Sequence, residues 1–200
     1  MYTETITGEN NTMEAINLGD IPDFSSFDET TNGTAPFDDG WYEGTILGRR
    51  SFTDQNGNDR VFESSDAPSA KGDSRNIRLQ VEIKRQTDGR TLNVSTLVNY
   101  LPEHLTQQTL QAVAKRREEA KESGEQMGDL FRPFMTLTRL AKLQKIAGVR
   151  QFQRNGDGGL DLSSLYGKKA YFRLAPDKRN DKYKEIADYN AEAPKRGKVN

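Results

Sequence analysis

The sequence predicts a mainly β fold, in which five strands form a small barrel and helices are inserted between the third and fourth strands. Three observations lead to this prediction. Short runs of alternating apolar and polar residues, the pattern of half-buried strands, occur three times before residue 99 and twice after residue 168. Apolar residues recur at helical spacing between these two groups. Residues suited to turns, such as Asp88-Gly89, separate the runs.

The first three strands are expected within residues 41–98. Residues 41–48 (WYEGTILG) alternate moderately, and their glycines indicate a bulge or a bend. Residues 49–76 read as a long polar connection, and connections of this length are usually functional or disordered. The alternation is strict over residues 77–84 and returns over residues 92–98, so the turn between them predicts a hairpin.

Two helices and two further strands complete the predicted order. One helical pattern follows Pro102 and stops at Gly124. A second covers residues 130–148 and has lysines in its last turns, as a helix C-terminus prefers. Strands follow at 169–174 and 183–189, joined by a basic loop. This order of elements matches an OB-fold, a partly open five-stranded barrel whose face and loops bind oligonucleotides.

Composition divides the chain into parts. Hydrophobic residues make up 33% of the 200 residues and the mean hydropathy is -0.88, so a single core is not expected to include the whole chain. Residues 1–36 have few apolar side chains and are predicted to be a disordered arm. Residues 37–190 are predicted to form the OB-fold domain, and residues 191–200 a flexible basic tail.

Composition also excludes several classes of protein. The chain has no cysteine and one histidine, His104, which excludes disulfide frameworks, thiol nucleophiles and sites that need two imidazoles. It contains no phosphate-binding or dinucleotide-binding glycine motif, so we expect no cofactor and no enzymatic activity. It has neither a run of 18 apolar residues nor a secretory leader, so we expect a cytoplasmic protein with no membrane partner.

The near-neutral total charge hides a strong asymmetry. Residues 1–40 hold nine acidic side chains and no Lys or Arg, so the remaining 21 acidic and 29 basic side chains give the rest of the chain a charge of +8. Such asymmetry indicates a nucleic acid or another anionic partner. Within the acidic part, Leu18, Ile21, Phe24 and Phe27 lie among carboxylates. This segment is either a solubilising tail, a docking segment for a partner protein, or a competitor for the basic region.

Basic side chains are interleaved with aromatic ones on the predicted strands and long loops. This combination is typical of single-stranded nucleic-acid binding, because aromatic rings stack on bases while Lys and Arg neutralise phosphates. Aromatic residues on alternating strands more often face a core, but Phe52 and Phe62 lie in a polar stretch with little core to join. The candidate phosphate contacts are Arg49, Arg50, Arg60, Lys71, Arg75, Arg78, Lys84, Arg90, Arg173, Lys178, Arg179 and Lys182, and the candidate stacking residues are Trp41, Phe52, Phe62 and Tyr171.

Two alternatives stay open at this point. Asp73 followed by Glu82-Ile83-Lys84 is similar to the carboxylates and lysine of Mg²⁺-dependent nucleases, although this triplet arises easily by chance in a highly charged chain. The third class is a non-enzymatic module that binds a host protein. Binding of nucleic acid with and without Mg²⁺ separates the three.

Four stretches resemble phage-encoded single-stranded-DNA-binding proteins of replication and recombination modules. They are residues 40–46 (GWYEGTI), 71–94, 137–148 (LTRLAKLQKIAG) and 162–174 (LSSLYGKKAYFRL). The resemblance implies an OB-fold that protects displaced DNA strands in the host cytoplasm and recruits replication or recombination proteins through an acidic tail. In bacterial counterparts that tail is C-terminal, whereas the acidic segment here is N-terminal. The oligomeric state is left open.

Overall fold

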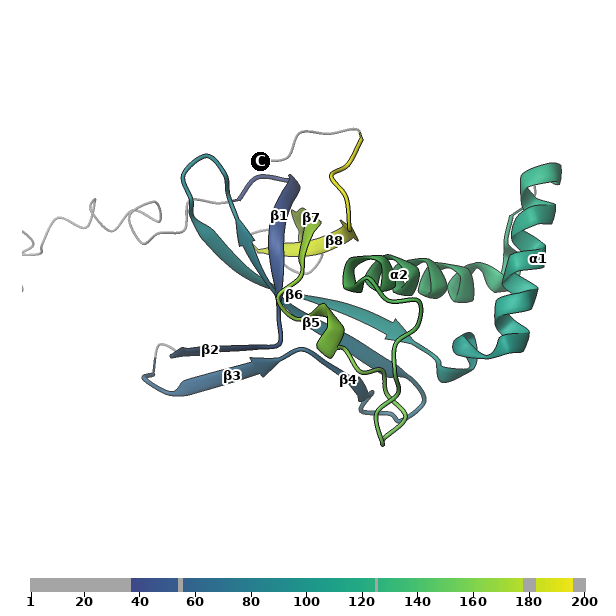
Figure 1. The fold of residues 1–200 in the computed structure, drawn as a ribbon, viewed down its shortest axis with the longest axis horizontal. Helices are drawn as coiled ribbons and strands as arrows, with labels where there is room; N and C mark the ends of the chain where they lie inside the picture. The colour runs from purple at the N-terminus through teal and green to yellow at the C-terminus, as the bar shows by residue number, and fades with distance from the viewer. Residues whose placement is uncertain (1–36, 54–55, 125, 178–182, 196–200) are drawn as a thin grey trace, which may run out of the picture. The chain divides into compact units, whose positions relative to one another are not determined.

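The computed structural model describes residues 37–53, 56–124, 126–177 and 183–195 (Figure 1). Its main feature is a six-stranded antiparallel sheet. The strands follow the order β4 (Ser65–Pro68), β5 (Arg75–Lys84), β1 (Gly40–Leu47), β7 (Lys169–Pro176) and β8 (Lys184–Asn190), and β6 (Thr91–Tyr100) also pairs with β5. A separate two-stranded ribbon consists of β2 (Arg49–Thr53) and β3 (Asp59–Glu63).

All five strands predicted from the sequence are present, and the two helices lie between the third and fourth of them, as expected. The prediction for residues 49–76 was wrong in part, because this stretch contains β2, β3 and β4. Most side chains of the ribbon are exposed, so it lacks the apolar alternation that reveals a half-buried strand. In the described residues the sheet is not a closed barrel, since β6 and β8 contact each other without pairing.

Alternation explains how the sheet makes its core. Ile77, Leu79, Val81 and Ile83 of β5 are fully or almost fully buried. The charged residues Arg78, Glu82 and Lys84 are exposed on the other face. Gly44 of β1 lies where an added Cβ would be 2.9 Å from the ring of Phe172, so a side chain at this position would displace the core. The absence of a side chain at Gly44 therefore leaves room for Phe172 of β7 and Ile83 of β5 in the core.

The two helices contribute unequally to the core. Helix α2 (Phe131–Ala147) buries Leu140, Leu143 and Ile146 against it and ends at Gly148, whose φ of 74° suits a helix C-terminus. Helix α1 (Gln107–Ser123) is capped by Thr106, whose side chain accepts a hydrogen bond from the backbone N–H of Thr109, and it buries only Val113. Figure 1 shows α1 at the edge of the molecule, beyond α2.

Three short 3₁₀ turns complete the described elements: η3 (Pro102–Leu105), η4 (Gly128–Leu130) and η5 (Ser163–Leu165). Within the described parts of the chain, neither helix is long and apolar enough to cross a membrane. The predicted acidic arm, residues 1–36, lies outside the described residues.

Candidate nucleic-acid interface

The β2–β3 ribbon has two chemically different faces. Its register places Arg50 opposite Phe62 and Phe52 opposite Arg60, and directly opposed residues of antiparallel strands point to the same side. These four side chains therefore share one face, which we call the aromatic–arginine face. The other face carries a mixed set: Arg49, Ser51, Thr53, Asp59, Val61 and Glu63. Four of the sixteen predicted site residues thus lie together.

The aromatic–arginine face is organised around a ring pair. The rings of Phe52 and Phe62 are nearly parallel, with centroids 5.4 Å apart and an interplanar angle of 10°. The guanidinium carbon of Arg50 lies 5.4 Å from the centroid of Phe52 and 5.3 Å from that of Phe62, within cation–π distance of both. Phe52 is 41% exposed, because the ribbon lies outside the hydrophobic core.

Arg50 also has an unused hydrogen-bond donor. Its Nε atom is buried and has no partner among the described residues. A buried donor without an acceptor is unfavourable by roughly 1–3 kcal/mol. The arginine side chain as a whole still carries its positive charge beside the two rings, and a guanidinium binds phosphate with charge assistance.

The base of the ribbon is fixed by hydrogen bonds around Ser64. The backbone N–H of Ser64 donates to Gly48 over 2.9 Å, and its hydroxyl donates to the carbonyl of Leu47 over 2.5 Å. The hydroxyl of Tyr166 donates to the carbonyl of Ser64 over 3.0 Å, and an added Cβ on Gly48 would lie 2.8 Å from the ring of Tyr166. Sequence reasoning did not identify Tyr166, because its partners lie more than 100 positions away in the chain.

The hydrogen bonds around Ser64 fix the orientation of the ribbon relative to the main sheet. In Figure 1 it extends sideways from the end of β1, away from both helices. A two-stranded ribbon alone is only marginally stable in water, so the contacts at its base are what position it.

A second group of predicted residues lies on the sheet face opposite the core. Trp41 pairs with Arg173, and Glu43 pairs with Tyr171, so the two aromatic side chains are diagonal neighbours with Arg173 beside them. Arg78 and Lys84 of β5 are exposed on the same face. This face also carries acidic side chains: Glu43 forms an ion pair with Lys169 at 3.0 Å, and Glu82 is exposed on β5.

The prediction that Arg75 contacts a phosphate was wrong. Arg75 is only 8% exposed. Its Nε donates to Asp66 Oδ1 over 3.0 Å, and its Nη2 donates to Asp157 Oδ2 over 2.9 Å. Burial alone would lower the pKa of Arg75, but these carboxylates raise it above its ordinary value. Arg75 therefore joins β4 and β5 to the 154–160 turn and is not available to a ligand.

The remaining predicted residues are dispersed. Lys71 is exposed in the turn between β4 and β5, and Arg90 lies in the β5–β6 turn, 3.4 Å from Asp88. In that turn a hydrogen bond from Arg85 lowers the pKa of Asp88 to about 2. Three predicted residues lie outside the described part of the chain: Lys178, Arg179 and Lys182.

The residues of the nuclease alternative do not come together. Glu82 and Lys84 share the open face of β5, but Asp73 lies in the turn before that strand. The seven steps from Arg75 to Glu82 span roughly 23 Å of extended strand, too far for one Mg²⁺ ion to join Asp73 and Glu82.

Comparisons with known proteins add no family. No protein-family model matches the chain, and no curated protein matches it.

Proposed function

We propose that the protein binds single-stranded DNA with little sequence preference, without catalysis, and that the aromatic–arginine face of the ribbon is its main contact. The observation that carries this proposal is the stacked Phe52–Phe62 pair with Arg50 beside both rings, on a protruding ribbon. Every base offers a π-face, so such a platform tolerates any sequence, and each stacked base contributes about 1–3 kcal/mol.

The fold supports the same proposal. Strand β1 pairs with β5 and β7, β5 pairs with β6, β7 pairs with β8, and the helices lie between β6 and β7. This is the arrangement that we propose to be an OB-fold, with the ribbon and β4 inserted between its first and second strands. In OB-folds the loop in this position binds oligonucleotides together with the face of the second and third strands. Here that face carries Arg78 and Lys84.

The proposed binding mode gives each residue a role. Phe52, the exposed ring, stacks on a base, and Phe62 supports it from behind. Arg50 and Arg60 neutralise phosphates beside the stacked base, and Trp41, Tyr171 and Arg173 continue the path on the sheet. The resemblance of four sequence stretches to phage single-stranded-DNA-binding proteins supports a role in phage DNA replication or recombination in the host cytoplasm.

Fluorescence anisotropy with labelled oligo-dT tests the proposal. Phe52→Ala should weaken binding by about 1–3 kcal/mol, roughly five- to 150-fold, because it removes the ring on which one base stacks. Val61→Ala is the matched control, since Val61 is 45% exposed on the other face of the same ribbon, and it should change affinity less than about twofold.

Two further measurements complete this test. Affinity should fall steeply with added salt, because phosphate contacts release counterions. A wild-type affinity of the Phe52→Ala variant would show that the aromatic–arginine face is not the contact. Cleavage of the oligonucleotide in Mg²⁺ that is lost in Glu82→Ala would replace the proposal with the nuclease alternative.

A further inference from the structure

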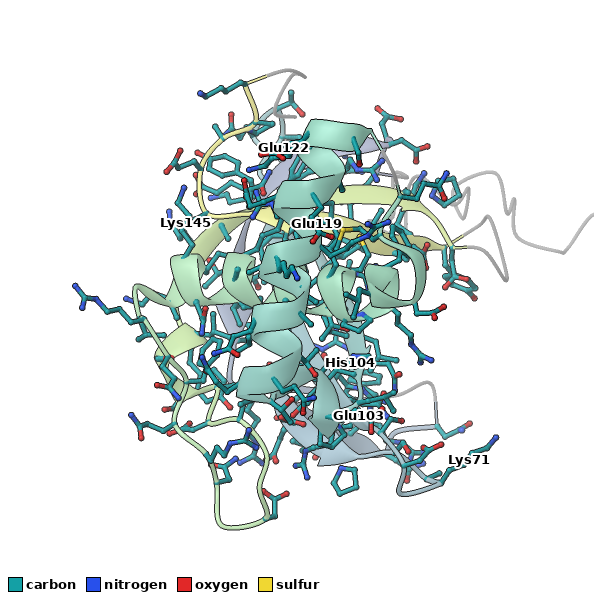
Figure 2. All side chains as sticks on the ribbon, turned by 90° about the vertical axis from the view of Figure 1, so that its right-hand side faces the viewer. Lys71, Glu103, His104, Glu119, Glu122 and Lys145 are labelled. Atoms are coloured by element: carbon teal, nitrogen blue, oxygen red, sulfur yellow. The ribbon has the colours of Figure 1, made fainter. Side chains whose placement is uncertain are left out.

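An apolar groove follows helix α2 on the side that α1 partly covers. It consists of two adjoining hollows of about 500 and 490 Å³, which share Leu110, Leu137 and Ala141 in their lining. One hollow continues to Val113 and Phe134, between the two helices, and the other reaches Phe152 in the segment after α2. Figure 2 looks at this end of the molecule and shows α1 crossing in front of α2.

The floor of the groove is solvent-accessible although it is aliphatic. Leu110 is 39% exposed, and Ala141 is also exposed. Helix α1 buries only Val113, so it leaves much of the apolar surface of α2 open to solvent. Exposed aliphatic surface that forms a hollow favours a partner with apolar side chains.

The rim of the groove is basic. Arg117, Lys142 and Lys145 line the first hollow, Arg150 and Arg154 line the second, and neither lining includes an Asp or Glu among the described residues. Lys142 pairs with Asp188 at 2.5 Å, and Lys145 pairs with Glu192 at 2.7 Å. The second pair is largely exposed on both sides, so it contributes little to stability and a competing carboxylate can replace Glu192.

We propose that this groove docks an acidic segment of a partner protein whose apolar side chains line one face. Apolar side chains would enter the hollows over Leu137 and Ala141, as amphipathic helices do in apolar grooves. The carboxylates of the partner would meet Arg117, Arg150 and Arg154 and would compete with Glu192 for Lys145. Charge complementarity selects this partner. Nucleic acid fits poorly, because the shared floor is aliphatic and offers no stacking ring.

The groove is separate from the proposed DNA contact. It lies along α2, whereas the ribbon extends from the end of β1, away from both helices (Figure 1). The docking of a peptide therefore does not depend on the proposed function, and a partner bound here leaves the aromatic–arginine face open.

The test uses the full chain and a fluorescein-labelled peptide of about 16 residues with Leu and Phe on one helical face and Asp and Glu elsewhere. Ala141→Glu places a carboxylate on the groove floor and should weaken peptide binding at least about tenfold. Ala112→Glu is the matched control, because Ala112 is exposed on α1 and lines neither hollow, and it should have less than about a twofold effect.

A second pair of variants tests the charge of the rim. Arg117→Gln should weaken binding about threefold, whereas Lys115→Gln, which changes an exposed charge outside the groove lining, should not. Equal binding of a peptide with the same composition in scrambled order, or no effect of Ala141→Glu, would overturn the proposal. Ala141→Glu should leave the affinity for oligo-dT unchanged, so failure of this inference and failure of DNA binding are distinguishable.

One more variant tests whether the chain's own acidic segment, and not a partner protein, occupies the groove. In it Asp20, Asp23 and Asp28 become Asn and Glu29 becomes Gln, which removes the four carboxylates closest to the apolar residues Leu18–Phe27 of the chain's own acidic segment. If the labelled peptide binds only to this variant, the groove is occupied by that segment, and the assignment to a partner protein is wrong. Equal binding to both chains supports the partner.

Discussion

Asp66→Ala should strongly destabilise the protein, because Asp66 is the acceptor of a buried network. Its side chain is fully buried, at 0% exposure. It accepts hydrogen bonds from Arg75 Nε at 3.0 Å, from the Tyr100 hydroxyl at 2.6 Å and from the backbone N–H of Leu160 at 2.7 Å. Burial and this carboxylate raise the pKa of Tyr100, so its hydroxyl stays protonated and donates. Alanine would leave all three donors without this acceptor.

The expected loss in the free energy of unfolding follows from the hydrogen-bond donors that Asp66→Ala leaves without an acceptor. Removing one partner of a buried ion pair is destabilising by about 3–5 kcal/mol, and Asp157 offsets part of this because it still holds Arg75. The two neutral donors add about 1–3 kcal/mol each, and terms within one network do not add fully. We expect about 4 kcal/mol in total. For a domain of this size that corresponds to a fall in Tm of roughly 8–16 °C.

Thermal unfolding followed by circular dichroism measures this loss. Asp73→Ala is the control, because Asp73 bonds to Ser69 in an exposed turn close to the network, and it should change Tm by less than about 2 °C. A Tm for Asp66→Ala within about 3 °C of the wild-type value would refute the reasoning.

The same network predicts how Arg75 behaves in DNA binding. Arg75→Met should lower stability but leave the salt dependence of oligo-dT affinity unchanged at a temperature where both chains are folded. A phosphate contact would instead reduce the slope of log affinity against log salt by about 0.7. A reduction of that size would return Arg75 to the binding site.

Three other outcomes are expected. Tyr166→Phe removes the hydrogen bond to Ser64 at the base of the ribbon and should weaken oligo-dT binding about threefold with a Tm change below about 4 °C; an unchanged affinity would show that the bond does not position the ribbon. The pKa of Asp88 is lowered from 3.8 to about 2, so its stabilising contact is present above pH 4 and is lost toward pH 2. The difference in Tm between wild type and Asp88→Asn should therefore close between pH 4 and pH 2. A constant difference would contradict this. Neutralising Asp20, Asp23, Asp28 and Glu29 should tighten oligo-dT binding at low salt by removing negative charge, and equal affinity at all salt concentrations would argue against competition by the acidic segment.

The sequence predicted the parts of the fold that bury one face of an element. β5 alternates apolar residues that face the core with polar residues, and α2 repeats its apolar residues at helical spacing, so both were found. β2 and β3 were missed because they bury almost nothing, yet Phe52 and Phe62 were correctly singled out as aromatic residues outside the core. Their stacking depended on a strand register that composition does not specify.

The site was harder to predict where it depends on distant residues. Arg75 and Arg78 lie on opposite faces of β5, because Arg75 shares the alternation of the buried Ile77 and Leu79, whereas the strand expected from the sequence began at residue 77 and did not include Arg75. Its partners Asp66 and Asp157 lie 9 and 82 positions away, and local patterns do not report such contacts. Tyr166 meets Ser64 across 102 positions. No local pattern reports such a contact, because it follows from the way the whole sheet assembles.

Helix α1 has a consequence for how the chain can vary. With a single buried side chain, most of its 17 residues are free of the demands of folding and need only preserve helix propensity. Among homologous chains, substitutions in α1 should therefore be common on its solvent side. Invariance at Leu110, Ala114 or Arg117 would have to come from selection for recognition, since the core does not require these three side chains.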